Sequence, residues 1–208
     1  MDKQIYRKFA KKALKDEAKF SAKCKHYGII SNIIKLIKIT NSKKVLIFMP
    51  LSYEPNLQIL RQKLSHRVEF FVPFMLDVSF KMVKFKRPFV KSKFGVKETL
   101  NQNEFKGKID LAVVPVIGVD GNMARIGHGK GFYDMFFSAL NYKPIIVFVS
   151  IKDNFTNSII SQKHDIIGDF YFTPSKNYFK KGKYDRYCSS ISRGRSRCDN
   201  RLFYRQKD

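Results

Sequence analysis

Three glycines at every second position, Gly127, Gly129 and Gly131, follow a very apolar segment and precede a segment with helical spacing. Glycine lacks the Cβ atom that would keep a ligand away from the main chain, so consecutive N–H groups can converge on phosphate oxygens. The beginning of a helix adds positive potential at the same place. Arg125 and Lys130 bring full positive charges. The spacing therefore predicts a phosphate-binding loop.

Asp134 follows the last of these glycines by one helical step. A carboxylate there is placed to hold a magnesium ion that bridges the bound phosphates. The segment matches neither the dinucleotide-binding pattern G-x-G-x-x-G nor the P-loop pattern, since no Ser or Thr follows Lys130. Glycine-rich turns also serve structural ends, so spacing alone leaves a purely structural turn open.

The segments around this loop alternate between strand-like and helical patterns. Apolar runs typical of strands occur at 44–50, 68–73, 109–117, 144–150 and 169–173. Helical spacing occurs at 3–26, 57–64 and 132–140, and again at 29–37 as a second helix after a break at Gly28. This alternation predicts an α/β fold, a three-layer α/β/α single domain with a mainly parallel central sheet.

Two regions do not follow this alternation. Between 74 and 103 the pattern is irregular and indicates edge strands or a hairpin, followed by a loop at 94–99. Residues 176–208 are strongly basic and lack periodicity, which is typical of a mobile tail. We therefore expect an α/β domain at 1–175 and a flexible C-terminal tail at 176–208.

The composition limits the class of protein. With 208 residues and 44% hydrophobic residues the chain can bury one core of ordinary size. Its 41 Lys and Arg against 17 Asp and Glu give a net charge of +24, which would attract nucleic acid, an anionic membrane or a polyanionic metabolite, or would be carried by solvated lysines. Three cysteines without zinc spacing, and apolar runs far shorter than a membrane span, predict a cytoplasmic protein that does not enter the membrane.

The segment from Pro115 to Asp134 resembles the signature of the 5-formyltetrahydrofolate cyclo-ligase family, also called methenyltetrahydrofolate synthetase. That signature runs from a strand ending in Pro, through a turn and Arg-aliphatic-Gly, to a Gly-x-Gly-aromatic-Tyr-Asp helix start. Other parts agree in order, over about residues 1–175: Lys3 and Arg7, Tyr53 and Glu54, 94–96, His164 and Asp165, Asp169 and Thr173. The family's usual Gln is missing at 151–153, His128 replaces a common aromatic residue or Arg, and Met135 replaces a frequent Arg.

The resemblance implies an ATP- and Mg²⁺-dependent cyclisation of 5-formyltetrahydrofolate to 5,10-methenyltetrahydrofolate, with release of ADP and phosphate. A formyl oxygen is a poor leaving group, so its phosphorylation to an imidate phosphate lets the neighbouring folate nitrogen expel it. The implied partners are ATP as co-substrate and 5-formyltetrahydrofolate, with or without a polyglutamate tail, and we expect a monomer. The alternative is a basic nucleic-acid-binding protein on a catalytically inactive α/β scaffold.

The resemblance also assigns roles to individual residues. It assigns catalysis to Arg125, Lys130 and Tyr133. It assigns ATP binding to Lys3, Arg7, Arg125, Gly127, His128, Gly129, Lys130, Gly131, Phe132, Tyr133 and Asp134. It assigns the folate to Glu54, Met75 and Tyr133, and Mg²⁺ to Asp134 and Asp165. Phe85 and Phe89 could line an apolar slot for the pterin beside Met75, or could pack in the core.

Overall fold

The structure is a computed structural model of the 208-residue chain. It describes residues 2–76, 79–91, 97–100, 102–162, 164–180, 191 and 203–204, and of these it describes only the main chain for 20–25, 91 and 203–204. No helix among these residues is long and apolar enough to cross a membrane.

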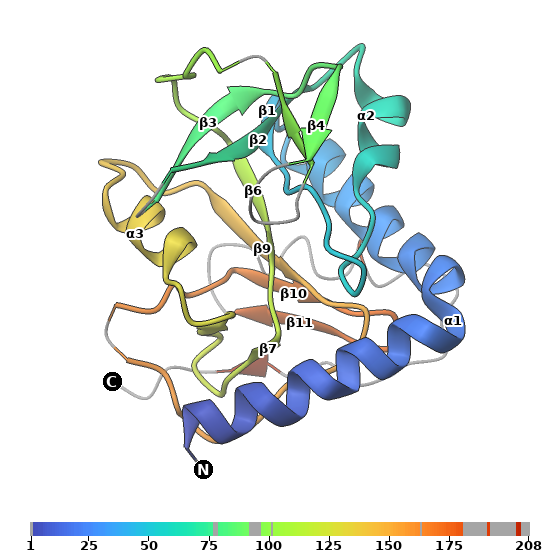
Figure 1. The fold of residues 1–208 in the computed structure, drawn as a ribbon, viewed down its shortest axis with the longest axis vertical. Coiled ribbons are helices and arrows are strands. Elements are labelled where there is room, and N and C mark those ends of the chain that lie inside the picture. Colours follow the sequence, from blue (N-terminus) through green and yellow to red (C-terminus); the bar gives the residue numbers. More distant parts are fainter. Residues whose placement is uncertain are drawn as a thin grey trace.

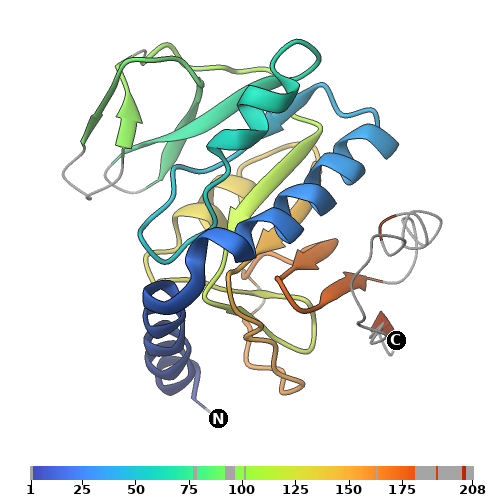
Figure 2. The same ribbon diagram turned by 90° about the vertical axis from the view of Figure 1, so that its right-hand side faces the viewer.

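One long helix, α1 (Lys3–Ile39), begins the chain and is capped by the Asp2 side chain, which accepts a hydrogen bond from the Gln4 N–H at 3.1 Å. The expected break at Gly28 is wrong, because the helix continues through this residue. A glycine inside a helix costs about 1 kcal/mol, and the tertiary packing of both halves outweighs this preference. Figures 1 and 2 show that the helix axis changes direction part-way along.

The central sheet has the order β12-β11-β10-β9-β6-β1-β2-β3. Its strands are β1 (Lys44–Leu46), β2 (Glu69–Met75), β3 (Phe80–Lys84), β6 (Leu111–Pro115), β9 (Ile145–Val149), β10 (Phe170–Phe172), β11 (Asn177–Lys180) and β12 (Phe203–Tyr204). The strands from β10 to β2 in this order run parallel to their neighbours, and β3 and β11 pair antiparallel to β2 and β10. The predicted, mainly parallel sheet is therefore confirmed.

Helices cover both faces of the sheet (Figure 1). The C-terminal half of α1 and α2 (Gln58–Leu64) cover one face, where Ile33 and Leu60 pack with Val113. The helix α3 (Phe132–Ser138) covers the other face, where Phe136 packs with Phe148. The expected three layers are therefore present.

Two short antiparallel pairs flank the sheet. β4 (Phe89–Lys91) pairs with β5 (Lys97–Thr99), and β7 (Gly118–Val119) pairs with β8 (Arg125–Ile126). The hairpin expected between 74 and 103 is present as β4 and β5, but 97–99 is a strand and not a loop. Residues 92–96 of the expected loop lie outside the described residues.

The chain changes direction across the sheet between β1 and β6. From β1 it crosses by α2 to β2 on one side, and from β6 it crosses by α3 to β9 on the other. The connections that leave the carboxyl ends of β1 and β6 therefore diverge, and such a switch point is where open α/β sheets bind ligands.

The end of the chain differs from the expected tail at its first residues. β11 continues the sheet beyond 175, since Tyr178 pairs with Tyr171 of β10. Most of 181–208 lies outside the described residues, so the mobility of this segment stays a prediction.

Candidate functional site

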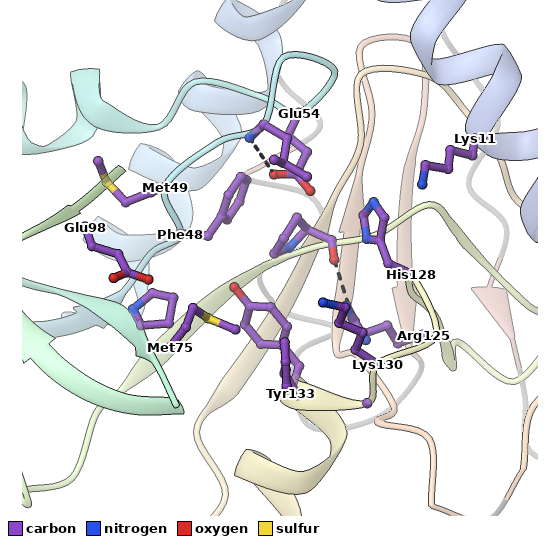
Figure 3. Close-up of a pocket in the computed structure, with 15 residues that line it drawn as sticks. Lys11, Phe48, Met49, Glu54, Met75, Glu98, Arg125, His128, Lys130 and Tyr133 are labelled. Carbon is purple, nitrogen blue, oxygen red and sulfur yellow. Dashed lines mark hydrogen bonds between the residues drawn. The ribbon is translucent and has the colours of Figure 1, made fainter. Parts of the chain in front are cut away.

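A cavity of about 470 Å³ lies at the carboxyl ends of β1, β2 and β6, at the switch point (Figure 3). One wall is apolar and consists of Phe48, Met49, Leu51, Pro73 and Met75. The wall opposite carries Lys11, Arg125, His128 and Lys130, and Gly131, Phe132 and Tyr133 continue it into α3. Two carboxylates, Glu54 and Glu98, also line the cavity. The cavity thus joins an apolar, acidic side to a basic side.

The three glycines of the loop meet different constraints. A Cβ atom at Gly127 would lie 2.3 Å from Nη1 of Arg125. Gly129 and Gly131 have φ angles of 102° and 68°, which residues other than glycine rarely adopt. Gly131 is also the N-cap of α3, so the last glycine sets the direction in which the helix begins.

Arg125 is held from three sides. Its Nη1 atom lies 3.2 Å from Oδ2 of Asp134, and its Nε atom donates to the carbonyl oxygen of Pro115 at 3.4 Å. The guanidinium also lies over the ring of Tyr133, 4.9 Å from the centroid. Because Arg125 is only 6% exposed, these contacts fix a positive charge at the floor of the cavity.

The carboxylates proposed for Mg²⁺ are already engaged. Oδ2 of Asp134 pairs with Arg125, and its Oδ1 accepts from the Ile166 N–H at 3.1 Å. Asp165 forms an ion pair with Lys3 and accepts from the Gln162 N–H at 2.7 Å. Across the described residues, no three His, Cys, Asp or Glu side chains are grouped so that they could hold a metal ion. This arrangement does not fit a magnesium ion held by Asp134 and Asp165.

The first turns of α1 fasten the helix to the loops of the site. Nε of Arg7 donates to the Gly127 carbonyl at 3.0 Å, Lys3 pairs with Asp165, and the Tyr6 hydroxyl donates to the Asn154 carbonyl. Tyr6, Ala10 and Leu14 pack with apolar residues of these loops, Ile117, Ile126 and Ile151. Lys3 and Arg7 thus contact the loops, whereas Lys11 reaches the cavity one turn later.

Glu54 and His128 have pKa values moved in opposite directions. Burial raises the pKa of Glu54 to about 7, although the Leu51 N–H, which donates to Oε2 at 2.9 Å, and Arg125 favour its charged form. Desolvation of the imidazole, then the charges of Arg125, Lys11 and Arg7, lowers the pKa of His128 to about 4. Nε2 of His128 lies 2.8 Å from the Tyr53 hydroxyl. At neutral pH the imidazole is therefore uncharged and links the turn after β1 to the glycine loop.

Tyr133 presents a neutral phenol to the cavity. Its ring packs edge-on against Phe80, with centroids 5.1 Å apart, and Figure 3 shows its hydroxyl directed into the cavity. Burial, and to a smaller extent Glu54, raises the pKa of Tyr133 above its usual range. The hydroxyl can therefore donate a hydrogen bond throughout the physiological pH range.

Comparison with known proteins now assigns the chain to a family. The sequence model of the 5-formyltetrahydrofolate cyclo-ligase family matches residues 1–171. The chain belongs to this family.

Individual relatives agree with this family assignment. A 5-formyltetrahydrofolate cyclo-ligase from Mycolicibacterium smegmatis is 30% identical over 70 residues, which cover 34% of this chain and only 36% of that relative's length. The structure of Aquifex aeolicus 5,10-methenyltetrahydrofolate synthetase has a TM-score of 0.71 at 22% identity, covering 94% of this chain and 96% of that chain. For a 5,10-methenyltetrahydrofolate synthetase from Mycoplasma pneumoniae the TM-score is 0.61 at 16% identity, covering 82% and 98%. At these identities the two structures show that the fold is shared.

The cavity collects part of the predicted site. Its lining includes eight of the predicted residues: Glu54, Met75, Arg125, His128, Lys130, Gly131, Phe132 and Tyr133. Lys3, Arg7, Gly127, Gly129, Asp134 and Asp165 lie outside this lining. Phe85 and Phe89 stack on each other against the core at 5.3 Å and do not line the cavity.

Other residues that line the cavity were not predicted. Phe48, Met49 and Pro73 come at or just beyond the ends of parallel strands, a position that could have marked them. Lys11 is one of many lysines in α1, and Glu98 lies in a short strand of an irregular region. Nothing local distinguishes these two residues in the sequence.

Proposed function

We propose that the chain catalyses the ATP-dependent cyclisation of 5-formyltetrahydrofolate to 5,10-methenyltetrahydrofolate, with release of ADP and phosphate. The observation that carries the proposal is the two-sided cavity at the switch point. Its basic side, with the glycine loop, suits a triphosphate, and its apolar and acidic side suits a flat ring rich in N–H donors.

The basic side would bind the phosphates of ATP. Gly129 and Gly131 leave the main chain uncovered, while Arg125 and Lys130 supply positive charge. Arg125 is fixed by its contacts, so little reorganisation is needed when negative charge develops during transfer. Catalysis by this side is mainly positioning and charge stabilisation.

The acidic, apolar side would bind the folate. The charged form of Glu54 can accept hydrogen bonds from the donor edge of the pterin, and Met75 contacts its faces. The Tyr133 hydroxyl lies between the two sides and can donate to an oxygen of the reacting groups.

The reaction has two steps. The formyl oxygen attacks the γ-phosphorus of ATP, the bond to the bridging oxygen breaks, and ADP leaves. The second folate nitrogen then attacks the formyl carbon and loses its proton, and the C–O bond breaks to release phosphate. Lys130 and Arg125 would stabilise the phosphoryl oxygens in both steps. No step is assigned to Mg²⁺, because Asp134 and Asp165 are engaged with Arg125 and Lys3.

An absorbance assay tests the proposal directly. Purified protein is mixed with 5-formyltetrahydrofolate, ATP and magnesium chloride, and the methenyl chromophore is followed. Growth of the absorbance only when ATP is present is the expected result. No turnover, combined with salt-sensitive retention of RNA, would instead support the nucleic-acid-binding alternative.

Replacing Lys130 tests the assignment of the basic side. Lys130→Ala should lower kcat/KM about 100- to 1,000-fold, the range for loss of one preorganised charge-stabilising group. The thermal unfolding midpoint should change little, because Lys130 is exposed. Lys106→Ala, which removes an exposed lysine outside the cavity, is the matched control and should keep full activity. Equal activity of the two variants would contradict the assignment.

A further inference from the structure

Glu98 is a buried carboxylate with an unused hydrogen-bond acceptor. It lies in β5 and is 8% exposed, and its Oε1 atom has no hydrogen-bond partner in the part of the chain that the structure describes. Figure 3 shows Glu98 on the side of the cavity that carries Met49 and Met75, across from Arg125 and Lys130.

The buried carboxylate of Asp120, by contrast, is fully hydrogen-bonded. Oδ1 of Asp120 accepts from the N–H groups of Asn122 and Ala124, and its Oδ2 accepts from those of Ile160 and Ser161, at 2.9–3.1 Å. Leaving one buried acceptor unpaired costs about 1–3 kcal/mol. The burial of Glu98 therefore lowers the stability of the fold, whereas the hydrogen bonds of Asp120 avoid this cost.

The Oε1 atom of Glu98 differs from the other buried atoms without a partner because Glu98 lines the cavity. His26 and Asp153 also carry a buried atom without a partner, but neither residue lines the cavity. Glu98 is thus the cavity residue, among those described, that combines burial with an unsatisfied acceptor. A ligand that enters the cavity can supply the missing donor.

We propose that Glu98 is a second substrate-binding carboxylate, whose Oε1 atom accepts a hydrogen bond from an N–H group of the bound folate. The proposal rests on the proposed function. A carboxylate repels phosphate, so the ligand group beside Glu98 is not part of ATP, and the cations that suit ATP lie on the opposite wall. Met49, Pro73 and Met75 provide soft, apolar contacts of the kind that a flat heteroaromatic ring needs.

A binding role and a structural role for Glu98 have opposite effects on the ligand-free protein. If the side chain supports the fold, its removal lowers stability. If its acceptor waits for a ligand, its removal leaves the stability of the ligand-free protein unchanged or raises it, and weakens folate binding. Glu98→Leu removes the acceptor, and Glu98→Gln keeps the shape with a neutral amide.

The experiment measures both properties for wild type, Glu98→Leu, Glu98→Gln and the control Glu104→Gln, which alters an exposed glutamate outside the cavity. For Glu98→Leu we expect an unchanged or higher unfolding midpoint, a KM for 5-formyltetrahydrofolate at least 10-fold higher, and a KM for ATP within twofold of wild type. Glu98→Gln should show a smaller rise in the folate KM, and the control none.

Two results would overturn the inference: an unchanged folate KM in both Glu98 variants, or a lower unfolding midpoint in both without ligand. If wild type shows no turnover, the proposed function fails, and calorimetric titration with 5-formyltetrahydrofolate alone then decides. Weaker binding by Glu98→Leu than by wild type supports the inference, and equal binding or no binding to wild type overturns it.

Discussion

Glu54 and His128 face the same cavity, yet each is driven toward its neutral form. For Glu54 the cause is burial, which outweighs the nearby Arg125. For His128 burial acts together with three cations. The cavity thus holds fewer charged groups than its residue types suggest, which lowers the cost of enclosing an apolar ring beside a polyanion.

The raised pKa of Glu54 gives a pH dependence with a defined sign. Its pKa is about 7 in the folded protein against an ordinary value of 4.5, so between these values the folded state binds more protons than the unfolded state. The stability that this group contributes is full below about pH 4.5 and is lost as the pH rises through 7. Glu54→Gln should therefore raise the unfolding midpoint relative to wild type more at pH 8 than at pH 5. An equal difference at both pH values would show that the pKa of Glu54 is not raised in the folded protein.

The glycine loop allows a contrast between space and backbone angle. Gly127→Ala places a methyl group 2.3 Å from Nη1 of Arg125 and should displace this guanidinium. Since a small misplacement of a positioned group can cost two orders of magnitude, we expect kcat/KM to fall about 100-fold. A Cβ atom at Gly131 would meet no atom closer than 3.9 Å, and asparagine tolerates a φ of 68°, so Gly131→Asn should keep most of the activity. Similar activity losses in the two variants would contradict this distinction.

How far the site could be predicted depended on how local its residues are. Arg125, Lys130 and Tyr133 belong to one continuous segment, and its glycine spacing alone predicts a phosphate-binding loop. Glu98 and Lys11 reach the cavity only through the tertiary arrangement of β5 and α1. The ion pair of Asp165 with Lys3 was equally hidden, because it joins residues far apart in the sequence.

At the scale of elements, α1 offers the clearest test. Gly28 lies inside this helix and is exposed, and a Cβ atom added to it would meet nothing within 4 Å. Gly28→Ala should stabilise the protein by about 0.5–1 kcal/mol, because alanine loses less backbone entropy on folding. For a chain of this size that corresponds to a rise of about 1–4 °C in the unfolding midpoint. A fall in a thermal melt would mean that the helix needs glycine at this place.

The same helix shows where element prediction stops. Gly28 is a local signal for a break, but Leu14 packs on the loops of the site and Ile33 on the sheet, and both contacts favour continued helix. The strands were predicted better, since a fully apolar run such as 111–117 is compatible with few structures other than a buried strand. β5 was missed because its three residues pair only with β4 and carry no apolar run.

At the scale of the whole molecule, the charge of +24 opposes compact structure. Raising sodium chloride from about 10 to 150 mM shortens the screening length from about 30 to 8 Å, which weakens this repulsion. We expect the unfolding midpoint to rise by a few degrees over this range, measured by circular dichroism. A constant or falling midpoint would show that attractive pairs outweigh the excess of lysine and arginine.

The layered architecture was predictable from the alternation of elements, and the cavity at the strand ends agrees with it. What the alternation could not provide was the path of α1, which leaves the sheet and crosses to the loops of the site (Figure 2). Where α1 packs on the sheet and where it packs on the loops, its apolar residues follow the same helical spacing. The sequence pattern therefore does not show which surface each half of the helix contacts.

The ion pair between Lys3 and Asp165 has a consequence for the order of events during synthesis. The two residues are 162 positions apart, so at roughly 5–20 residues per second a ribosome adds Asp165 on the order of 10–30 s after Lys3. Until Asp165 has been made, this ion pair cannot fasten the first turn of α1 to the loops of the site.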